Sequence, residues 1–151
     1  MIRDICIGVD TINAENLLEH FNSCDVHIEN VDLLEHSIKL RRYATTIEAW
    51  EREILVGLAA CYLNRPELGV AFITHIAILP KYQRKGIGRL LIRKVAELAK
   101  AKSFSELILE VKKNNEKALK FYFSMGFAVN EDRGDKYLMG AKIDKLKYKV
   151  C

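Results

Sequence analysis

The sequence predicts an α/β fold in which one mixed, mostly antiparallel sheet of about six or seven strands carries helices on both faces. Two observations predict this fold. Apolar residues switch repeatedly between the period of a helix and that of a strand, which gives the order β-α-α-β-β-β-α-β-α-β-β. A run of consecutive strands is then followed by a β-α-β unit, which places a parallel pair in an otherwise antiparallel sheet. The length of 151 residues, without a linker or repeat, predicts a single domain over residues 1–151.

The composition is typical of a globular protein and excludes several classes. Half of the residues are hydrophobic, 29% are charged, and the formal net charge is +4. The longest apolar run, residues 54–63, is too short to cross a bilayer, and the start M-I-R-D is unlike a signal peptide. The four cysteines, at positions 6, 24, 61 and 151, lack the spacing of a zinc site or a disulfide framework. We therefore expect a cytoplasmic protein with no metal and no membrane partner.

The first elements are read from local patterns. Residues 2–8 alternate and predict a strand, and residues 11–23 predict a helix with Thr11 and Glu15 as capping residues. Its apolar face is expected to comprise Ile12, Leu17, Leu18 and Phe21. A second helix over 31–41 is expected to bury Val31, Leu33, Leu34, Ile38 and Leu40.

The middle of the chain predicts three strands. Residues 43–50 and 54–63 are rich in β-branched, aromatic and small apolar residues, and the charged residues 51–53 between them predict a hairpin turn. A second turn at 65–69 leads to the apolar strand 70–79, which ends at Pro80.

The last third completes the fold. Ile87, Leu91, Val95 and Leu98 recur at helical spacing, which predicts a long amphipathic helix over 86–102. A strand is predicted over 106–112, then a helix over 114–125 that ends at Gly126, and finally two strands over about 127–131 and 136–143. The helix 114–125 is expected to bury Ala118, Leu119, Phe121, Tyr122 and Met125.

The segment that follows Pro80 predicts an anion site. A strand leads into a loop with Gly86 and Gly88, and the loop opens directly into a helix. The first N–H groups of a helix have no partner within it, and glycines let an anion approach them, so the arrangement suits a phosphate or pyrophosphate. From Lys81 to Lys102 there are eight Lys or Arg residues and one acidic residue, Glu97.

Other interpretations of this loop are weaker. A Walker A loop needs its lysine after the second glycine, whereas Lys85 precedes Gly86. A dinucleotide fingerprint would need Gly or Ala at position 91, where the chain has Leu91. A tight turn with a solvated basic face remains an alternative. The basic face has no interleaved aromatic residues, so we expect no nucleic-acid partner.

Two blocks of the sequence resemble one known family. The stretch Q-R-K-G-I-G (83–88) is similar to motif A of the GNAT acetyltransferases, [QR]-x-x-G-x-[GA]. The stretch 109–127, L-E-V-K-K-N-N-E-K-A-L-K-F-Y-F-S-M-G-F, is similar to a later block of that family. The match is ungapped at Asn115, Ala118, Tyr122, Gly126 and Phe127. The motifs are closest to those of ribosomal-protein alanine N-acetyltransferases, and the element order is that of the GNAT fold.

The resemblance implies acetyl-CoA as the cosubstrate. The main chain of Ile76, Ala77 and Ile78 would pair with its pantetheine arm, which requires the strand 70–79 to separate from 106–112 so that the thioester can reach the gap. Asn115 would contact the pantetheine region, although an asparagine at a helix start can simply cap the helix. The pyrophosphate would bind to the amides of Arg84, Lys85, Gly86, Ile87, Gly88 and Arg89, and Gln83 and Tyr122 are also implied to contact the cofactor.

The resemblance also implies catalytic residues. Tyr122 would protonate the departing CoA thiolate, unless it is an ordinary core tyrosine. The amine must lose a proton before it attacks, and Glu110 and His75 are the candidate bases. Glu110 could instead pair with a lysine across the sheet, His75 could be a histidine of the sheet interior, and an ordered water chain could replace both.

The implied function is direct transfer of an acetyl group to a primary amine, without an acyl-enzyme. The acceptor stays open among a small amine, an amino sugar and a protein N-terminus, and a homodimer is compatible with the resemblance. The alternative is a catalytically inactive CoA-binding sensor or interaction module, against which Tyr122 and the intact Q-R-K-G-I-G argue.

Overall fold

The structure, a computed structural model, describes residues 4–26, 28 and 31–147. The predicted element order is confirmed, with residues 2 and 3 of the first expected strand lying outside the described residues. The strands are β1 (Ile5–Val9), β2 (Thr45–Glu51), β3 (Ile54–Tyr62), β4 (Val70–Ile78), β5 (Glu106–Lys112), β6 (Ala128–Asp132) and β7 (Lys136–Lys142). The α-helices are α1 (Ala14–Ser23), α2 (Leu33–Tyr43), α3 (Ile87–Ala101) and α4 (Glu116–Met125). Short 3₁₀ turns lie at Pro66–Leu68, Pro80–Tyr82 and Ile143–Lys145.

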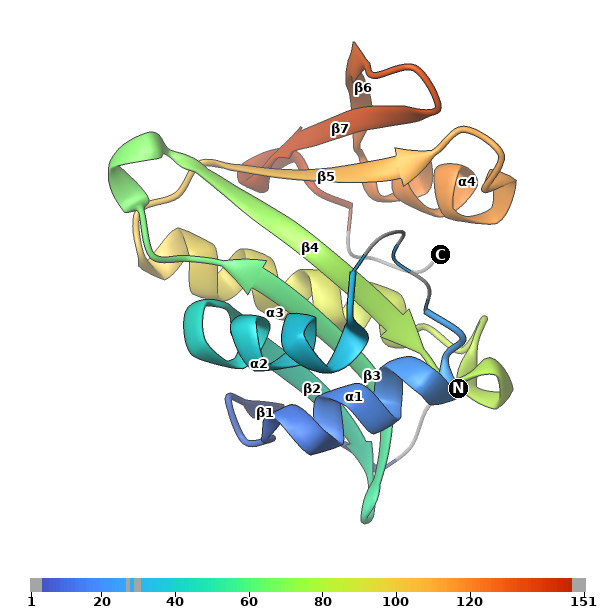
Figure 1. Ribbon diagram of the computed structural model, residues 1–151. Coiled ribbons are helices and arrows are strands. Elements are labelled where there is room, and N and C mark those ends of the chain that lie inside the picture. The colour runs from blue at the N-terminus through green and yellow to red at the C-terminus, as the bar shows by residue number, and fades with distance from the viewer. Residues whose placement is uncertain (1–3, 27, 29–30, 148–151) are drawn as a thin grey trace.

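All seven strands form one sheet with the order β1-β2-β3-β4-β5-β7-β6. Every neighbouring pair is antiparallel except β4 and β5, which are parallel, as the β-α-β unit predicted. These two strands pair only where Val70–Phe72 lie opposite Glu106–Ile108, and beyond this point they diverge in a V (Figure 1). The expected separation of the two strands is therefore confirmed.

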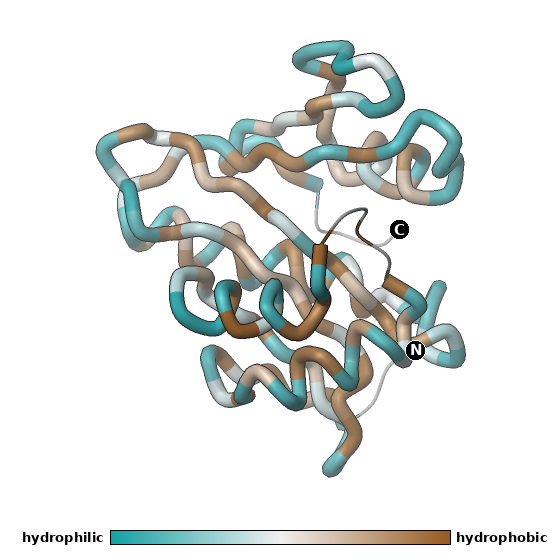
Figure 2. The backbone as a smooth tube through the Cα atoms, viewed as in Figure 1, coloured by the Kyte–Doolittle hydropathy of each residue, from teal (hydrophilic) through white to brown (hydrophobic). Residues whose placement is uncertain are grey.

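Two helices cover each face of the sheet (Figure 1). The larger apolar cluster lies between the sheet and α3 and includes Leu91, Val95 and Leu107, whereas Phe21 and Leu40 belong to a second cluster beneath α1 and α2. Figure 2 shows hydrophobic residues along the central strands and hydrophilic residues in the outer loops. The helices in the described part of the chain are all too short or too polar to span a bilayer.

A bulge in β4 decides which side chains face which helices. Ala60 lies opposite His75 and Cys61 opposite Ile73, so Thr74 is an extra residue in β4. Side chains alternate between faces along a strand, and one extra residue reverses the alternation beyond it. After the bulge, His75 therefore lies on the α1–α2 face and Ile76 on the α3–α4 face.

The expected apolar face of α2 is wrong in part. Leu40 is fully buried and Leu33 is half-buried, but Val31, Leu34 and Ile38 are exposed. The helix turns Leu33, Ser37 and Leu40 toward the sheet. Leu34 and Ile38 lie roughly 100° around the helix axis from Leu33 and Ser37, respectively, which places them on its outer flank.

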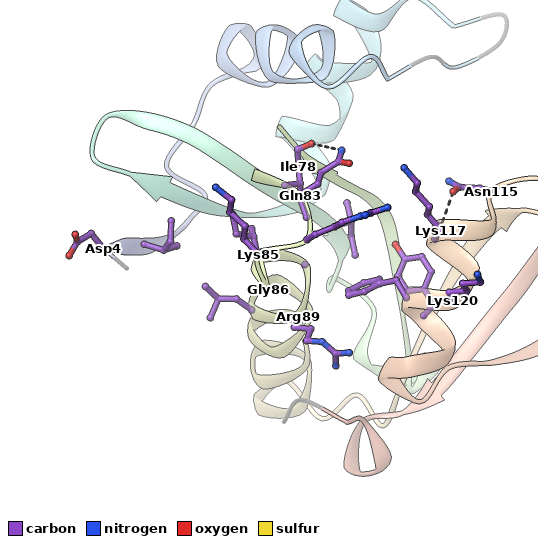
Figure 3. A pocket seen from close by; sticks show the side chains of 18 residues that line it. Asp4, Ile78, Gln83, Lys85, Gly86, Arg89, Asn115, Lys117 and Lys120 are labelled. Atoms are coloured by element: carbon purple, nitrogen blue, oxygen red, sulfur yellow. Dashed lines mark hydrogen bonds between the residues drawn. The ribbon is translucent and has the colours of Figure 1, made fainter. Parts of the chain in front are cut away.

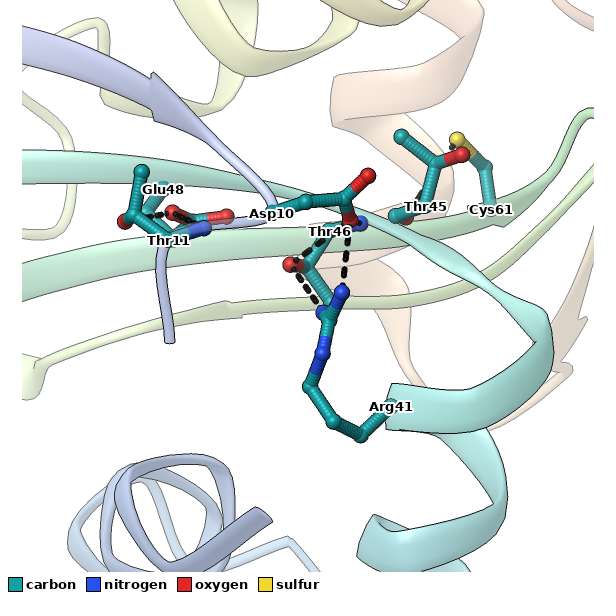
Figure 4. Close-up of polar contacts among 7 residues, drawn as sticks. All are labelled: Asp10, Thr11, Arg41, Thr45, Thr46, Glu48 and Cys61. Atoms are coloured by element: carbon teal, nitrogen blue, oxygen red, sulfur yellow. Dashed lines mark hydrogen bonds and ion pairs between the residues drawn. The ribbon is translucent and has the colours of Figure 1, made fainter. Parts of the chain in front are cut away.

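The capping of α1 also differs from the expectation. Asn13, rather than Thr11, is the N-cap: its side chain accepts from the Asn16 N–H at 2.8 Å, and the Asn16 side chain accepts from the Asn13 N–H. Thr11 instead donates its N–H and its hydroxyl to the buried carboxylate of Glu48 on β2 (Figure 4). Asp10 next to it accepts from the Thr46 N–H, so the start of α1 is tied to β2.

Candidate active site

A cleft of about 1260 Å³ lies between the first turn of α3, the end of β4 and the first turns of α4 (Figure 3). All of the residues that the sequence proposed for cofactor binding line it except Ala77. These are Ile76, Ile78, Gln83, Arg84, Lys85, Gly86, Ile87, Gly88, Arg89, Asn115 and Tyr122. Residues more than forty positions apart in the sequence therefore meet at one surface.

The first turn of α3 presents free backbone donors to this cleft. The helix begins at Ile87, and its N-cap is Gly86, which has φ of +87° and offers no side-chain cap. The N–H groups of the first helical positions have no partner within a helix, and the helix dipole adds partial positive charge there. A Cβ atom at Gly88 would lie 2.9 Å from Phe121 Cζ, so only glycine lets α3 and α4 approach this closely. The turn can bind an anion.

The side chains of the cleft add positive charge. Arg89 is held in place, because its guanidinium donates to the Ser124 hydroxyl at 3.1 Å and to the Lys147 carbonyl at 3.3 Å. Lys85 Nζ lies 5.4 Å from the centre of the Tyr82 ring. The described basic residues lining the cleft are Arg84, Lys85, Arg89, Lys117 and Lys120, against one acidic residue, Asp4.

The edge of β4 beyond its pairing with β5 faces the same cleft. Ile76 and Ile78 line it, and the Ile78 carbonyl accepts from the Gln83 side chain at 3.2 Å (Figure 3). Ala77 differs from its two neighbours. Its side chain is buried with α1 and α2, and its carbonyl accepts from His20 Nε2 at 2.9 Å.

The helix α4 begins later than expected because Asn115 is its N-cap. The Asn115 side chain accepts from the Ala118 N–H at 3.2 Å, so the capping role is present, and the same residue lines the cleft (Figure 3). The expectation that α4 buries five residues is wrong for four of them. Met125 is buried, whereas the others stay half-buried, and three of these four face the cleft: Ala118, Phe121 and Tyr122 line it, and Leu119 does not.

The Tyr122 side chain is packed edge-on between two rings. Phe121 lies 5.2 Å away and Phe127 5.6 Å away, centre to centre. Burial raises the pKa of Tyr122, so its phenol is protonated at neutral pH. Within the described residues, the Tyr122 hydroxyl has no hydrogen-bond partner, and it is therefore available as a donor to a ligand.

His75 lies on the opposite face of the sheet, under α1 and α2. Its Nε2 atom is 2.8 Å from His36 Nε2, and the Phe21 ring packs 4.8 Å from the His75 ring. Burial, followed by the neighbouring His36, lowers the pKa of His75 to about 4, so the ring is neutral at pH 7.

Glu110 is on that face too, because it alternates with the buried Leu109 and Val111 of β5. Arg133 Nη1 donates to one carboxylate oxygen at 3.0 Å, and Lys136 Nζ lies 3.6 Å from the other. Two cationic side chains therefore pair with Glu110. One of them, Lys136, is a lysine across the sheet, the alternative to a catalytic role that the sequence analysis kept open.

The structure thus divides the nominated residues between two faces. Tyr122 and Asn115 lie at the cleft of the α3–α4 face, whereas His75 and Glu110 lie on the α1–α2 face, and the V between β4 and β5 connects the two. Sequence reasoning missed three cleft residues of α4, Lys117, Lys120 and Phe121. Helical spacing could have revealed Phe121, three residues after Ala118, and Lys117, four residues before Phe121, but not Lys120, which lies nearly opposite Ala118 and Tyr122 around the helix.

The residues that the structure describes do not form a metal-binding site. No group of three or more His, Cys, Asp or Glu side chains there could hold an ion. Three cysteines are described, Cys6, Cys24 and Cys61, and all are free. Burial raises the pKa of the Cys24 thiol to about 11 and that of Cys61 to about 12, which makes both poor nucleophiles.

Comparison with known proteins adds a family match. The model of the acetyltransferase (GNAT) family matches residues 12–127, which contain the cleft loop and α4. Among curated proteins, N-alpha-acetyltransferase 30 of Xenopus laevis is 32% identical over 100 residues, which are 65% of this chain and 36% of that protein. The [ribosomal protein bS18]-alanine N-acetyltransferase of Escherichia coli K12 is 34% identical over 70 residues, 46% of this chain and 47% of that protein. The chain thus spans less than half the length of these relatives.

Solved structures share the fold. The PaiA N-acetyltransferase of Thermoplasma acidophilum, crystallised in complex with coenzyme A, superposes with a TM-score of 0.73 at 19% identity. The alignment covers 91% of this chain and 99% of that one.

Proposed function

This chain belongs to the GNAT family of acetyltransferases, and we propose that it transfers the acetyl group of acetyl-CoA directly to a primary amine. The observation that carries the proposal is the cleft, in which an uncapped helix N-terminus, surrounded by basic side chains, lies beside the unpaired edge of β4. A neighbouring fold that holds coenzyme A supports the same donor.

The chain's own groups suit the parts of acetyl-CoA. Its diphosphate would accept from the first N–H groups of α3, with Lys85 and Arg84 close by and no side chain on Gly86 or Gly88 to intervene. Its pantetheine amides would pair with the free edge of β4 at Ile76 and Ile78, for which the Gln83 side chain must release the Ile78 carbonyl. Strand-like pairing of this kind is a common way for a protein to bind an extended ligand.

The thioester would then lie in the V between β4 and β5. The amine attacks the carbonyl carbon, a C–N bond forms, and the C–S bond breaks as thiolate leaves. Tyr122 supports this step because its protonated phenol, unpartnered within the described residues, can give the thiolate a proton. On the other face, His75 and Glu110 are the candidates for taking a proton from the amine.

Direct transfer is favoured over an acyl-enzyme. The thiols of Cys24 and Cys61 stay protonated at neutral pH, and neither cysteine lines the cleft. With no activated nucleophile at the cleft among the described residues, the amine itself must attack the thioester.

The acceptor that we test first is the α-amine of a protein N-terminus. Two relatives, N-alpha-acetyltransferase 30 and the bS18-alanine enzyme, carry names that describe transfer to such amines. Small amines and amino sugars complete the panel.

The test is a thiol-release assay with acetyl-CoA and each amine in turn. Turnover that requires an amine, with the acetylated product found by mass spectrometry, supports the proposal. The matched variants are Gly88→Val, which should lose turnover and acetyl-CoA binding, and Ala101→Val, at the exposed far end of the same helix, which should keep both. Wild-type protein that binds CoA but acetylates nothing would favour a CoA-binding sensor instead.

A further inference from the structure

Two histidines from separate elements meet beside the V on the α1–α2 face. His36 of α2 and His75 of β4 bring their Nε2 atoms to 2.8 Å, and their rings meet edge to face at 72°. Two imidazole nitrogens at this distance must share a hydrogen, since one of them has to donate to the other. The contact depends on the bulge at Thr74, because an unbulged β4 would turn His75 to the other face.

We propose that His36 and His75 form a two-imidazole relay that carries the proton of the acceptor ammonium from the reaction site to solvent. The inference rests on the proposed function and names a route for one proton of that reaction. His36 is the ring from which the proton would leave to solvent, because it is half-exposed on α2. His75 is the inner ring of the pair, and Phe21 packs against it.

A single buried imidazole could not do this work at neutral pH. His75 has a pKa of about 4, so a proton taken from an ammonium would not stay on it. The ring can act only if it passes the proton on at once. The His36 imidazole, 2.8 Å away, provides the next step of that path. From His36 the proton passes to water, where its charge is solvated.

The proton balance closes without another reactant. The ammonium gives a proton to His75 Nδ1, His75 Nε2–H donates its proton to His36 Nε2, and His36 Nδ1–H releases one to water. Each ring ends neutral, with its hydrogen on the other nitrogen. The path requires both Nδ1 atoms to be free of protein partners, and within the described part of the chain neither has one.

The surroundings favour this route over Glu110. The carboxylate of Glu110 is held by Arg133 and Lys136, so its lone pairs are already engaged. Burial lowers the pKa of His36, and the neighbouring Lys39 on α2 lowers it further, which keeps the exit ring neutral and ready to release a proton. On α1, the ring of the buried His20 is hydrogen-bonded to the Ala77 carbonyl rather than to this pair.

The first experiment measures turnover of the amine identified in the thiol-release assay. We expect His75→Gln and His36→Ala each to lower kcat by ten- to a hundredfold with little change in KM for acetyl-CoA, and the double variant to be no worse than His75→Gln. Imidazole added to the buffer should restore kcat of His36→Ala with rising concentration, and not that of His75→Gln. Glu35→Ala, an exposed change beside His36, is the matched control and should keep wild-type kcat.

The second experiment does not depend on turnover. In ¹⁵N-histidine-labelled protein, the NMR titration of the His75 ring should move to higher pH in His36→Ala, because the neighbouring ring contributes to its low pKa. An unchanged His75 titration would show that the rings are not in contact and would overturn the relay. Wild-type kcat in His36→Ala, or no effect of imidazole on a slowed His36→Ala, would overturn it as well. A wild-type protein without any amine-dependent turnover would refute the proposed function itself, and the relay with it.

Discussion

Replacing the phenol of Tyr122 tests the chemical step without disturbing the fold. In Tyr122→Phe the ring keeps its packing between Phe121 and Phe127, and the lost hydroxyl leaves no partner unsatisfied among the described residues. The stability of the folded protein should therefore change by less than about 1 kcal/mol. If the phenol protonates the departing thiolate, its loss removes a contribution of about 10²-fold in kcat, or about 3 kcal/mol of barrier.

The assay separates binding from chemistry. Thiolate charge develops only in the transition state, so the Kd for acetyl-CoA, measured by calorimetry, should be close to wild type while kcat falls. Tyr137→Phe is the matched control, since Tyr137 is also half-buried against the same core but does not line the cleft. A Tyr122→Phe protein that melts much earlier yet keeps wild-type turnover per folded molecule would show that Tyr122 is a packing residue. The proton donor would then have to be water.

Three further predictions follow from the same contacts. Acetyl-CoA at 100 times its Kd should stabilise the wild type by about 2.7 kcal/mol in thermal melts, and Gly88→Val, which places side-chain atoms against Phe121, should abolish that shift. The pKa of His75 is about 4 in the folded protein and about 6.5 in the unfolded chain, so the unfolded chain binds a proton first as the pH falls. The free energy of unfolding should therefore fall by up to about 3 kcal/mol between pH 6.5 and pH 4. In urea titrations, the free energy of unfolding of His75→Gln should depend less on pH. Thr11→Val should cost about 1–3 kcal/mol in urea denaturation, because it removes the hydroxyl donor to the buried carboxylate of Glu48, and equal stability would show that water replaces that donor.

Local patterns were enough to predict most of the fold. The strand β5 matches its expected bounds, and α3 differs from its expected span by one residue at each end, because Ile87, Leu91 and Val95 repeat at an unbroken helical period and glycine marks the start. The face of α2 was harder to predict, since Leu34 and Ile38 are as apolar as Leu33 and Leu40. Which of two adjacent apolar flanks is buried depends on where the helix lies on the sheet, and that is a tertiary property.

The residues of the cleft could be predicted from the sequence, whereas the contact on the opposite face could not. Gly86, Gly88 and Asn115 lie at helix starts, where backbone geometry restricts the residue type, so a short motif describes them well. The pairing of His36 with His75 could not be read in this way. It depends on one unpaired residue in β4, Thr74, which has no distinctive side chain and leaves no mark in the hydrophobic pattern.

In the proposed mechanism, the bulge would also let one strand contact both substrates. Before Thr74, β4 pairs with β5 and contributes Ala71 and Ile73 to the core; beyond it, the edge is free and the side chains have changed faces. Ile76 and Ile78 then line the cleft that we propose for acetyl-CoA, whereas His75 lies on the α1–α2 face beside His36. The reaction must give one proton to the thiolate and remove one from the ammonium, and a proton donor next to a proton acceptor would tend to neutralise it. In the proposed mechanism, the positions of Tyr122 and His75 on opposite faces of the sheet would keep the two proton transfers apart, while the V would let both groups reach the same thioester.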